Sequence, residues 1–194
     1  MKCTSAADAR LAKGSDRCGK GSADEHAEFL GLWSQLQLSS LHGFPLWEKD
    51  VHYALLNDYT QLKSIFRAYA AGSLDGSATD MDMEEFHDFC IECDLPTKEY
   101  GFDTMTLQYS EANAGSNDSV LELHEFLTML VRISFFRANP SYGMRLGDNR
   151  KAKANEDRDR ADLYGEGVPL PGCLSDMLTN LVLPNARHDT YAQE

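Results

Sequence analysis

The chain has 194 residues, of which 42% are hydrophobic, so it is long enough and apolar enough to bury one or two hydrophobic cores. Its formal net charge of −13 argues against nucleic-acid binding, which requires clustered Lys and Arg side chains to neutralise phosphates. Its five cysteines are irregularly spaced, which indicates reduced thiols rather than a disulfide framework.

The sequence also lacks membrane signals. No run of apolar residues approaches the roughly 18 that a spanning helix needs, and the first 23 residues lack the apolar centre of a secretory signal. We therefore expect no membrane interaction and a cytoplasmic or cytoskeletal location.

The N-terminal third divides into two predicted segments. Residues 1–24 are rich in Ala, Gly, Ser and Lys without periodicity, which predicts a flexible tail. Residues 25–57 predict two N-terminal helices. The first should end just before Pro45, because the residue before a proline avoids helical geometry, and the second should cover residues 47–56.

The middle of the chain, residues 58–138, predicts four helices in two pairs. Asp58 followed by Gln61 matches a capping box, which predicts a helix beginning at Asp58. A polar loop follows, and then a helix from Met83 to about Cys93.

The second pair is predicted in the same way. Asp103 is expected to cap its first helix, and residues 114–120 form the loop. Its second helix runs from Leu123 to about Phe136 and must end before Pro140.

The C-terminal part separates into a linker and a short helix. Residues 139–167 are dense in charges of both signs, which predicts a solvated linker. Within residues 168–194, one helical face is apolar, and Pro184 is expected to end the helix; the apolar positions are Leu174, Met177, Leu178 and Leu181. A helix this short is marginal alone, so we expect it to dock on the rest of the chain.

The two helix pairs repeat one pattern at an offset of forty residues. Each has an isolated apolar residue after the polar loop, then a Glu four residues later, then a Phe that opens a second apolar stripe. The matching residues are Met81 with Leu121, Glu85 with Glu125, and Phe86 with Phe126. We expect Met81 and Leu121 to pair as a short ladder between the loops.

This order resembles the calmodulin-like EF-hand superfamily, whose helix–loop–helix unit places a carboxylate at the last loop position. The resemblance implies an all-α fold. Its centre would be a paired EF-hand-like module over residues 58–138, with extra N-terminal helices and a C-terminal docking helix. The groove of the paired hands is then the expected place for the docking helix.

The first loop matches the calcium ligands of the family poorly. When Glu85 is counted as the twelfth loop position, the first, third and fifth positions fall on residues without a side-chain oxygen, namely Leu74, Gly76 and Ala78. A loop lengthened by one residue instead offers Ser73, Asp75, Ser77, Asp82 and Glu85.

The second loop can also be read in two registers. The lengthened register offers Asn113, Asn117, Glu122 and Glu125, and the ordinary register offers Ser116, Asp118, Glu122 and Glu125. Neither loop has the Asp at position one or the Gly at position six that the family pattern expects. The resemblance therefore implies calcium binding that is weak or lost.

Several of these residues have structural interpretations. Asp82 with Glu85 is itself a capping box, so Glu85 can stabilise a helix start without a metal. His87, Cys90 and Cys93 suggest zinc, but the two cysteines align with Leu130 and Ile133 of the repeat and no fourth ligand is apparent. They are predicted to be core thiols.

Three functional hypotheses follow. No nucleophile or phosphate-binding motif is present, so we expect a non-enzymatic adaptor or regulatory protein. Its expected partner is a helical segment of another protein or its own C-terminal helix, with calcium binding weak or lost. The alternatives are a genuine calcium sensor that uses the lengthened loops and a structural component of a larger assembly.

Overall fold

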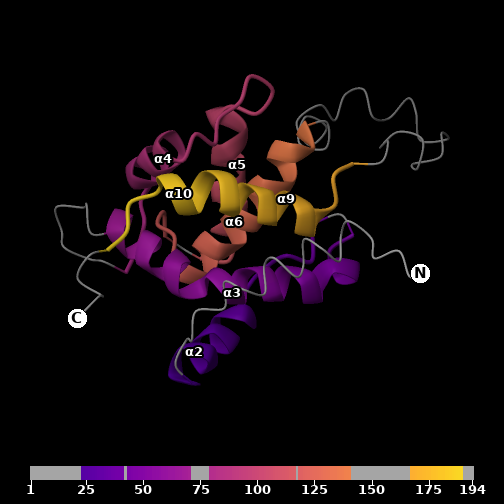
Figure 1. Ribbon diagram of the computed structural model, residues 1–194. Helices are drawn as coiled ribbons and strands as arrows, with labels where there is room; N and C mark the ends of the chain where they lie inside the picture. Colours follow the sequence, from indigo (N-terminus) through magenta and orange to yellow (C-terminus); the bar gives the residue numbers. More distant parts are fainter. Residues whose placement is uncertain (1–22, 42, 71–78, 117, 141–166, 190–194) are drawn as a thin grey trace, which may run out of the picture.

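The computed structural model describes residues 23–41, 43–70, 79–116, 118–140 and 167–189. Throughout these ranges the chain is all-α, as predicted (Figure 1). Its one extended pairing there is an isolated bridge between two residues. None of the helices in these ranges is long and apolar enough to cross a membrane. Most of the predicted tail and linker, residues 1–22 and 141–166, lies outside the described residues.

Helix α3 is a single helix of 27 residues, Phe44–Ala70. The predictions of a separate helix over residues 47–56 and of a helix beginning at Asp58 are therefore wrong, and the predicted boundary at residue 57 falls inside α3. Its apolar stripe is continuous from Val51 to Tyr69, and no Gly or Pro interrupts it. Asp58 lies within the helix and is only 9% exposed. The capping-box signature was coincidental, because a sequence match cannot distinguish a helix start from a helix interior.

The prediction that the first helix ends just before Pro45 is also wrong, and the N-terminus of α3 shows why. Helix α2, Ala23–Trp33, ends earlier than predicted, and Pro45 stands in the first turn of α3 rather than after a helix. A proline is tolerated there because the first backbone N–H groups of a helix have no intrahelical partner. Gly43, just before α3, has a φ of +70°, and a Cβ there would also lie 3.2 Å from the Trp47 ring.

Helices α4, Met83–Glu92, and α5, Phe102–Ala112, follow. The extent of α4 agrees with the prediction, and Asp94 reverses the chain after it with a φ of 51°. The N-cap of α5 is Gly101, so the prediction that Asp103 caps this helix is wrong. Asp103 instead lies in the first turn, where a negative charge is favoured by the helix dipole.

Helix α6, Leu123–Ala138, is the central element of the fold. Every residue from Glu125 to Phe136 is buried, so this helix is covered on all sides. It ends before Pro140, as predicted, and Asn139 caps its C-terminus. Four of its buried residues are polar, namely Glu125, Thr128, Arg132 and Ser134.

The C-terminal helix is longer than predicted. It runs through α9, Leu170–Met177, a π-helical stretch η2, Leu178–Val182, and a short α10, Leu183–Asn185. Pro184 lies inside α10 and does not end the helix, which corrects the sequence prediction. In the π-helical stretch, the Leu183 amide donates to the Leu178 carbonyl, and this wider turn makes room for a proline that ordinary α geometry would exclude.

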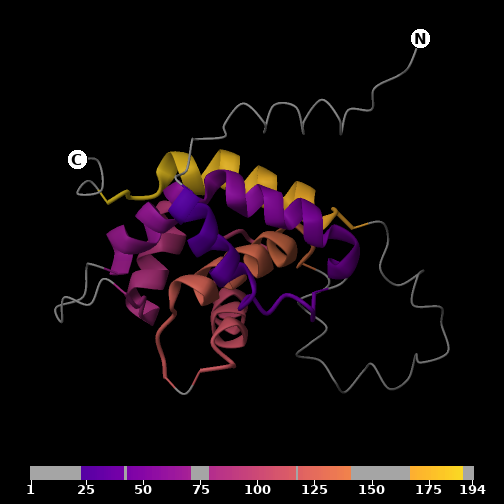
Figure 2. The ribbon, with the colours of Figure 1, turned by 90° about the horizontal axis from the view of Figure 1, so that it is seen from below.

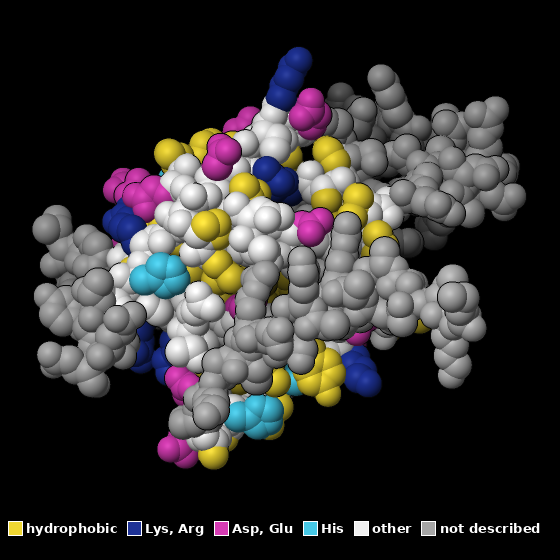
Figure 3. All heavy atoms as spheres, viewed as in Figure 1, with side chains coloured by type: hydrophobic (Ala, Val, Ile, Leu, Met, Phe, Trp, Pro, Cys, Tyr) yellow, Lys and Arg dark blue, Asp and Glu magenta, His cyan; other side chains and the backbone are white. Residues whose placement is uncertain are grey.

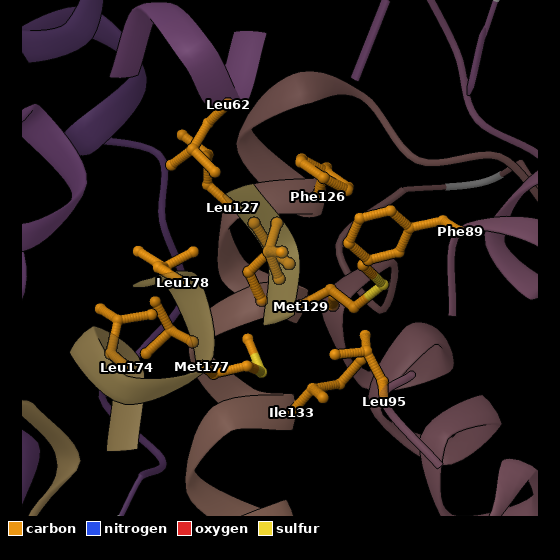
Figure 4. Close-up of a cluster of buried hydrophobic side chains, with 14 of the residues drawn as sticks. Leu62, Phe89, Leu95, Phe126, Leu127, Met129, Ile133, Leu174, Met177 and Leu178 are labelled. Atoms are coloured by element: carbon orange, nitrogen blue, oxygen red, sulfur yellow. The ribbon is translucent and has the colours of Figure 1, made fainter. Parts of the chain in front are cut away.

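The C-terminal helix packs against both α3 and α6, and Figure 2 shows it lying beside α3. Figure 4 shows side chains of α9 and η2 meeting those of α3 and α6 in one buried cluster, labelled Leu62, Leu127, Ile133, Leu174, Met177 and Leu178. The apolar face predicted for the C-terminal helix is thus largely buried within the chain.

Candidate functional site

The two loops are joined by an antiparallel bridge between Met81 and Leu121, as the repeat predicted. The Met81 amide donates to the Leu121 carbonyl at 2.9 Å, and the Leu121 amide donates to the Met81 carbonyl at 2.8 Å. Both side chains are fully buried. The bridge fixes the ends of the two loops, and therefore the starts of α4 and α6, next to each other.

Tyr109 of α5 stabilises the bridge through its hydroxyl group. Its hydroxyl lies 3.0 Å from the Met81 carbonyl oxygen and 2.7 Å from the Ser119 carbonyl oxygen, so its proton can be donated to either. The sequence analysis assigned no role to Tyr109. A buried tyrosine generally needs a partner for its hydroxyl, and this is the signal that was missed.

Asp82 and Glu85 form the predicted capping box at the start of α4. Asp82 Oδ1 accepts from the amides of Glu84 at 2.8 Å and Glu85 at 2.9 Å. Glu85 Oε2 accepts from the Asp82 amide at 3.0 Å. The carboxylates that the resemblance assigns to calcium thus also stabilise a helix start.

We expect Asp82→Ala to lower the free energy of unfolding by about 1 kcal/mol, because two amides at the start of α4 lose their acceptor. Urea denaturation followed by circular dichroism would measure the loss. Asp82→Asn is the matched control, since an asparagine caps as well as an aspartate, and it should leave stability nearly unchanged. Equal stability of the alanine variant and the wild type would contradict this role.

Glu122 and Glu125 form a second capping box at the start of α6, which the sequence analysis did not predict. Glu125 Oε2 accepts from the Glu122 amide at 2.9 Å, and Oε1 accepts from the Ser116 hydroxyl. Glu125 is only 3% exposed. Each of its oxygens already accepts a hydrogen bond from the protein, so a cation bound to both would have to use their remaining lone pairs or displace these donors.

Asn113 and Asp118 lie across the second loop from each other. Asn113 Nδ2 donates to the Asp118 carbonyl at 3.0 Å, and the Asn113 carbonyl accepts from the Ser116 amide at 3.0 Å. Asn113 is 9% exposed, and within the described part of the chain its Oδ1 has no hydrogen-bond partner. An amide oxygen in this position is a ligand type that calcium accepts.

The structure thus brings several predicted ligands of the second loop together. Of the predicted ligands of the first loop, it describes only Asp82 and Glu85. Ser73, Asp75, Ser77 and Asn117 lie outside the described residues. Over the ranges that the structure describes, no three His, Cys, Asp or Glu side chains are grouped so that they could hold a metal ion.

Negative charge concentrates around the bridge. Burial raises the pKa of the Tyr109 hydroxyl, and four nearby carboxylates raise it further, those of Asp82, Glu125, Asp118 and Glu85. An open depression of about 570 Å³ lies here, and its lining includes Asp82, Glu84, Tyr109 and Asp118. The electrostatic field at the loops therefore favours a cationic group.

Cys90 and Cys93 are core residues, as the repeat predicted. Both are fully buried, and burial raises the pKa of both thiols, that of Cys93 to about 12. A thiol held in its neutral form is a poor nucleophile and a poor metal ligand. His87, on the same helix, packs its ring 4.8 Å from that of Phe102.

Comparison of the chain with protein-family models, with curated proteins and with solved structures found no match.

Proposed function

We propose that this chain is a non-enzymatic adaptor or regulatory protein of the EF-hand type, which binds a partner protein through its helices and whose calcium binding is weak or lost. Two helix–loop–helix units, α3 with α4 and α5 with α6, would be the paired hands. The observation that carries the proposal is the bridge between Met81 and Leu121, which joins equivalent positions of the two repeats.

The proposal of weak or lost calcium binding is supported by the hydrogen bonds that the loop carboxylates already accept from the protein. Asp82, Glu85, Glu122 and Glu125 take part in capping boxes, and Glu125 also accepts from Ser116. These contacts stabilise the starts of α4 and α6 with protein groups alone. Paired units held in this way keep their shape at any calcium level, as a constitutive adaptor requires.

A calcium sensor is the second candidate, and Asn113 favours it. An unpaired buried amide oxygen costs about 1–3 kcal/mol, and a cation bound in the second loop would remove that cost. Asp118 and Glu125 would supply its carboxylates, and the lengthened first loop would supply Asp75, Asp82 and Glu85. Calcium binding there would compete with the capping hydrogen bonds of Glu125.

Calorimetric titration of the full chain with calcium separates the two candidates. For the adaptor we expect no binding heat at micromolar calcium, and the same melting temperature with calcium and with a chelator. Micromolar binding that is lost in Glu125→Gln would instead establish the sensor. Asp103→Asn is the matched control because Asp103 is an exposed acidic residue outside both loops. Its titration should be that of the wild type.

A further inference from the structure

The segment from Val168 to Asp189, here called the C-terminal segment, covers an apolar surface formed by α3 and α6. Its anchors are five buried apolar side chains, Leu170, Leu174, Met177, Leu178 and Val182. They recur at helical spacing, and Figure 4 shows Leu174, Met177 and Leu178 facing residues of the other two helices. Apolar contacts of this kind are not directional, so the surface suits any amphipathic helix with similar spacing.

At its start, the C-terminal segment is held through its backbone. Asn139 Oδ1 accepts from the Val168 amide at 2.8 Å, and Asn139 Nδ2 donates to the Val168 carbonyl at 3.1 Å. Asn139 is buried, whereas the Val168 side chain is exposed. This contact therefore requires an extended residue before the helix but does not select its side chain.

At its end, the C-terminal segment is held by Arg187. Its Nε donates to Glu92 Oε2 at 2.8 Å, and its guanidinium carbon lies 4.5 Å from the centre of the Tyr69 ring. A second nitrogen of the guanidinium lies 3.4 Å from Asp88 Oδ2. In Figure 3, acidic and basic side chains lie side by side at the upper left of the coloured surface. The hydrogen bond from Arg187 lowers the pKa of the Glu92 carboxyl.

The contacts of Arg187 connect α3 with α4. Tyr69 is next to the last residue of α3, and Glu92 is the last residue of α4. The Tyr69 hydroxyl also donates to Glu92 Oε2 at 2.6 Å and accepts from the Arg187 amide at 3.2 Å. One arginine thus holds the ends of α3 and α4 in a fixed relation.

The C-terminal segment has features of a replaceable element. Its helix consists of the eight residues of α9, a π-helical stretch and the three residues of α10, one of which is a proline, so it gains its stability from the surface beneath it. Residues 141–166 separate it in sequence from α6, so it can leave the surface while that connection stays intact. Its departure would expose a large apolar surface, which favours exchange for another helix over an empty surface.

We propose that the α3–α6 surface is a docking site for an amphipathic helix of a partner protein, and that the C-terminal segment occupies this site in cis. The inference rests on the proposed adaptor function. The partner would present an extended residue, then large apolar side chains at the spacing of positions 170, 174, 177, 178 and 182, then an arginine five residues later.

Charge favours a foreign helix over a second copy of this chain. Two copies, each with a net charge of −13, repel each other, whereas a basic helix is attracted. The docking site ends at the acidic pair Asp88 and Glu92, which suits a basic C-terminal end. A partner richer in Lys and Arg than the C-terminal segment would therefore compete with it effectively.

The test is a peptide exchange on the full chain. A protease recognition sequence is placed within residues 141–166, the chain is cut, and a fluorescent synthetic peptide of residues 167–194 is added in tenfold excess. We expect the peptide to replace the cut segment while circular dichroism of the protein stays unchanged. The uncut chain should resist exchange, because tethering in cis gives an effective concentration on the order of millimolar.

Variants test which contacts hold the segment. Arg187→Gln is expected to release the cut segment about three to ten times faster, because an exposed ion pair and a cation–π contact are lost. Lys98→Gln makes the same change of charge at an exposed residue that takes no part in the contacts described above, and it should leave the release rate unchanged. A peptide carrying Leu174→Asp should fail to exchange.

Other outcomes would overturn the inference. If the peptide never exchanges, or exchanges only as the remaining helices unfold, the C-terminal segment is a permanent part of the core. If full-length copies swap the segment and form a dimer, the occupant in trans is a second copy. Neither outcome bears on calcium, so the calorimetric titration tests the proposed function independently.

Discussion

Replacing Phe126 by alanine should lower the free energy of unfolding by about 3–5 kcal/mol. Phe126 is fully buried on α6, and its ring centre lies 5.4 Å from those of Phe66 on α3 and Phe89 on α4. The substitution would therefore remove contacts to two other helices and leave a cavity between them. Urea denaturation followed by circular dichroism would measure the change in the unfolding midpoint.

Two controls show whether this loss reflects packing. Phe126→Leu keeps most of the apolar volume and should cost less than about 1.5 kcal/mol. Leu107→Ala truncates an apolar side chain on α5, but Leu107 is 54% exposed, so stability should change by no more than about 0.5 kcal/mol. A loss below 1 kcal/mol for Phe126→Ala would contradict a core shared by both repeats.

Replacing Arg132 by methionine should cost about 2–3 kcal/mol, because it leaves a buried acceptor without its donor. Arg132 is 4% exposed, and its Nε donates to Gln108 Oε1 at 3.0 Å. Its two terminal nitrogens contact Ser40 and Glu111. Burial lowers the pKa of the guanidinium, and the Glu111 carboxylate opposes this effect. The arginine thus joins α5, α6 and the segment that precedes α3.

The double variant Arg132→Met with Gln108→Leu separates the lost hydrogen bond from lost packing. Removing both polar partners leaves no unpaired group at this position, so we expect it to recover at least half of the lost stability. Thermal and urea unfolding of the two single variants and the double variant complete the cycle. If Arg132→Met alone is as stable as the wild type, the buried cation contributes no net stability.

The sequence predicted the parts of the fold that depend on near neighbours. Helix α4 with its Asp82 capping box, the end of α6 before Pro140 and the pairing of Met81 with Leu121 all agree with the structure. Caps act over three residues, and a proline disrupts helical geometry locally. Such features can be recognised without knowing what packs against them.

The errors arose where the same local signal fits two environments. Asp58 and Gln61 match a capping box, yet Asp58 lies inside α3, where burial of its apolar neighbours keeps the helix continuous. Pro184 was expected to end the C-terminal helix, but packing on α3 and α6 and the π-helical turn retain it. Contacts between distant residues outweighed local preference in both cases.

At the candidate site, too, local features could be predicted from the sequence, whereas contacts between distant residues could not. The repeat located both loops and their last glutamates, but the donors to those glutamates and the role of Tyr109 required the structure. The contact of Arg187 with Tyr69 and Glu92 joins residues about a hundred positions apart, and no sequence pattern marks it.

By itself, the sequence determined that this protein is helical, acidic and built around a twofold repeat, because periodicity, charge and capping are properties of neighbouring residues. Only the tertiary structure decided that the C-terminal segment covers α3 and α6 and that a buried arginine joins distant elements. Those contacts depend on which apolar surfaces meet when the chain closes, and that choice minimises exposed apolar area over the whole chain rather than within any one segment.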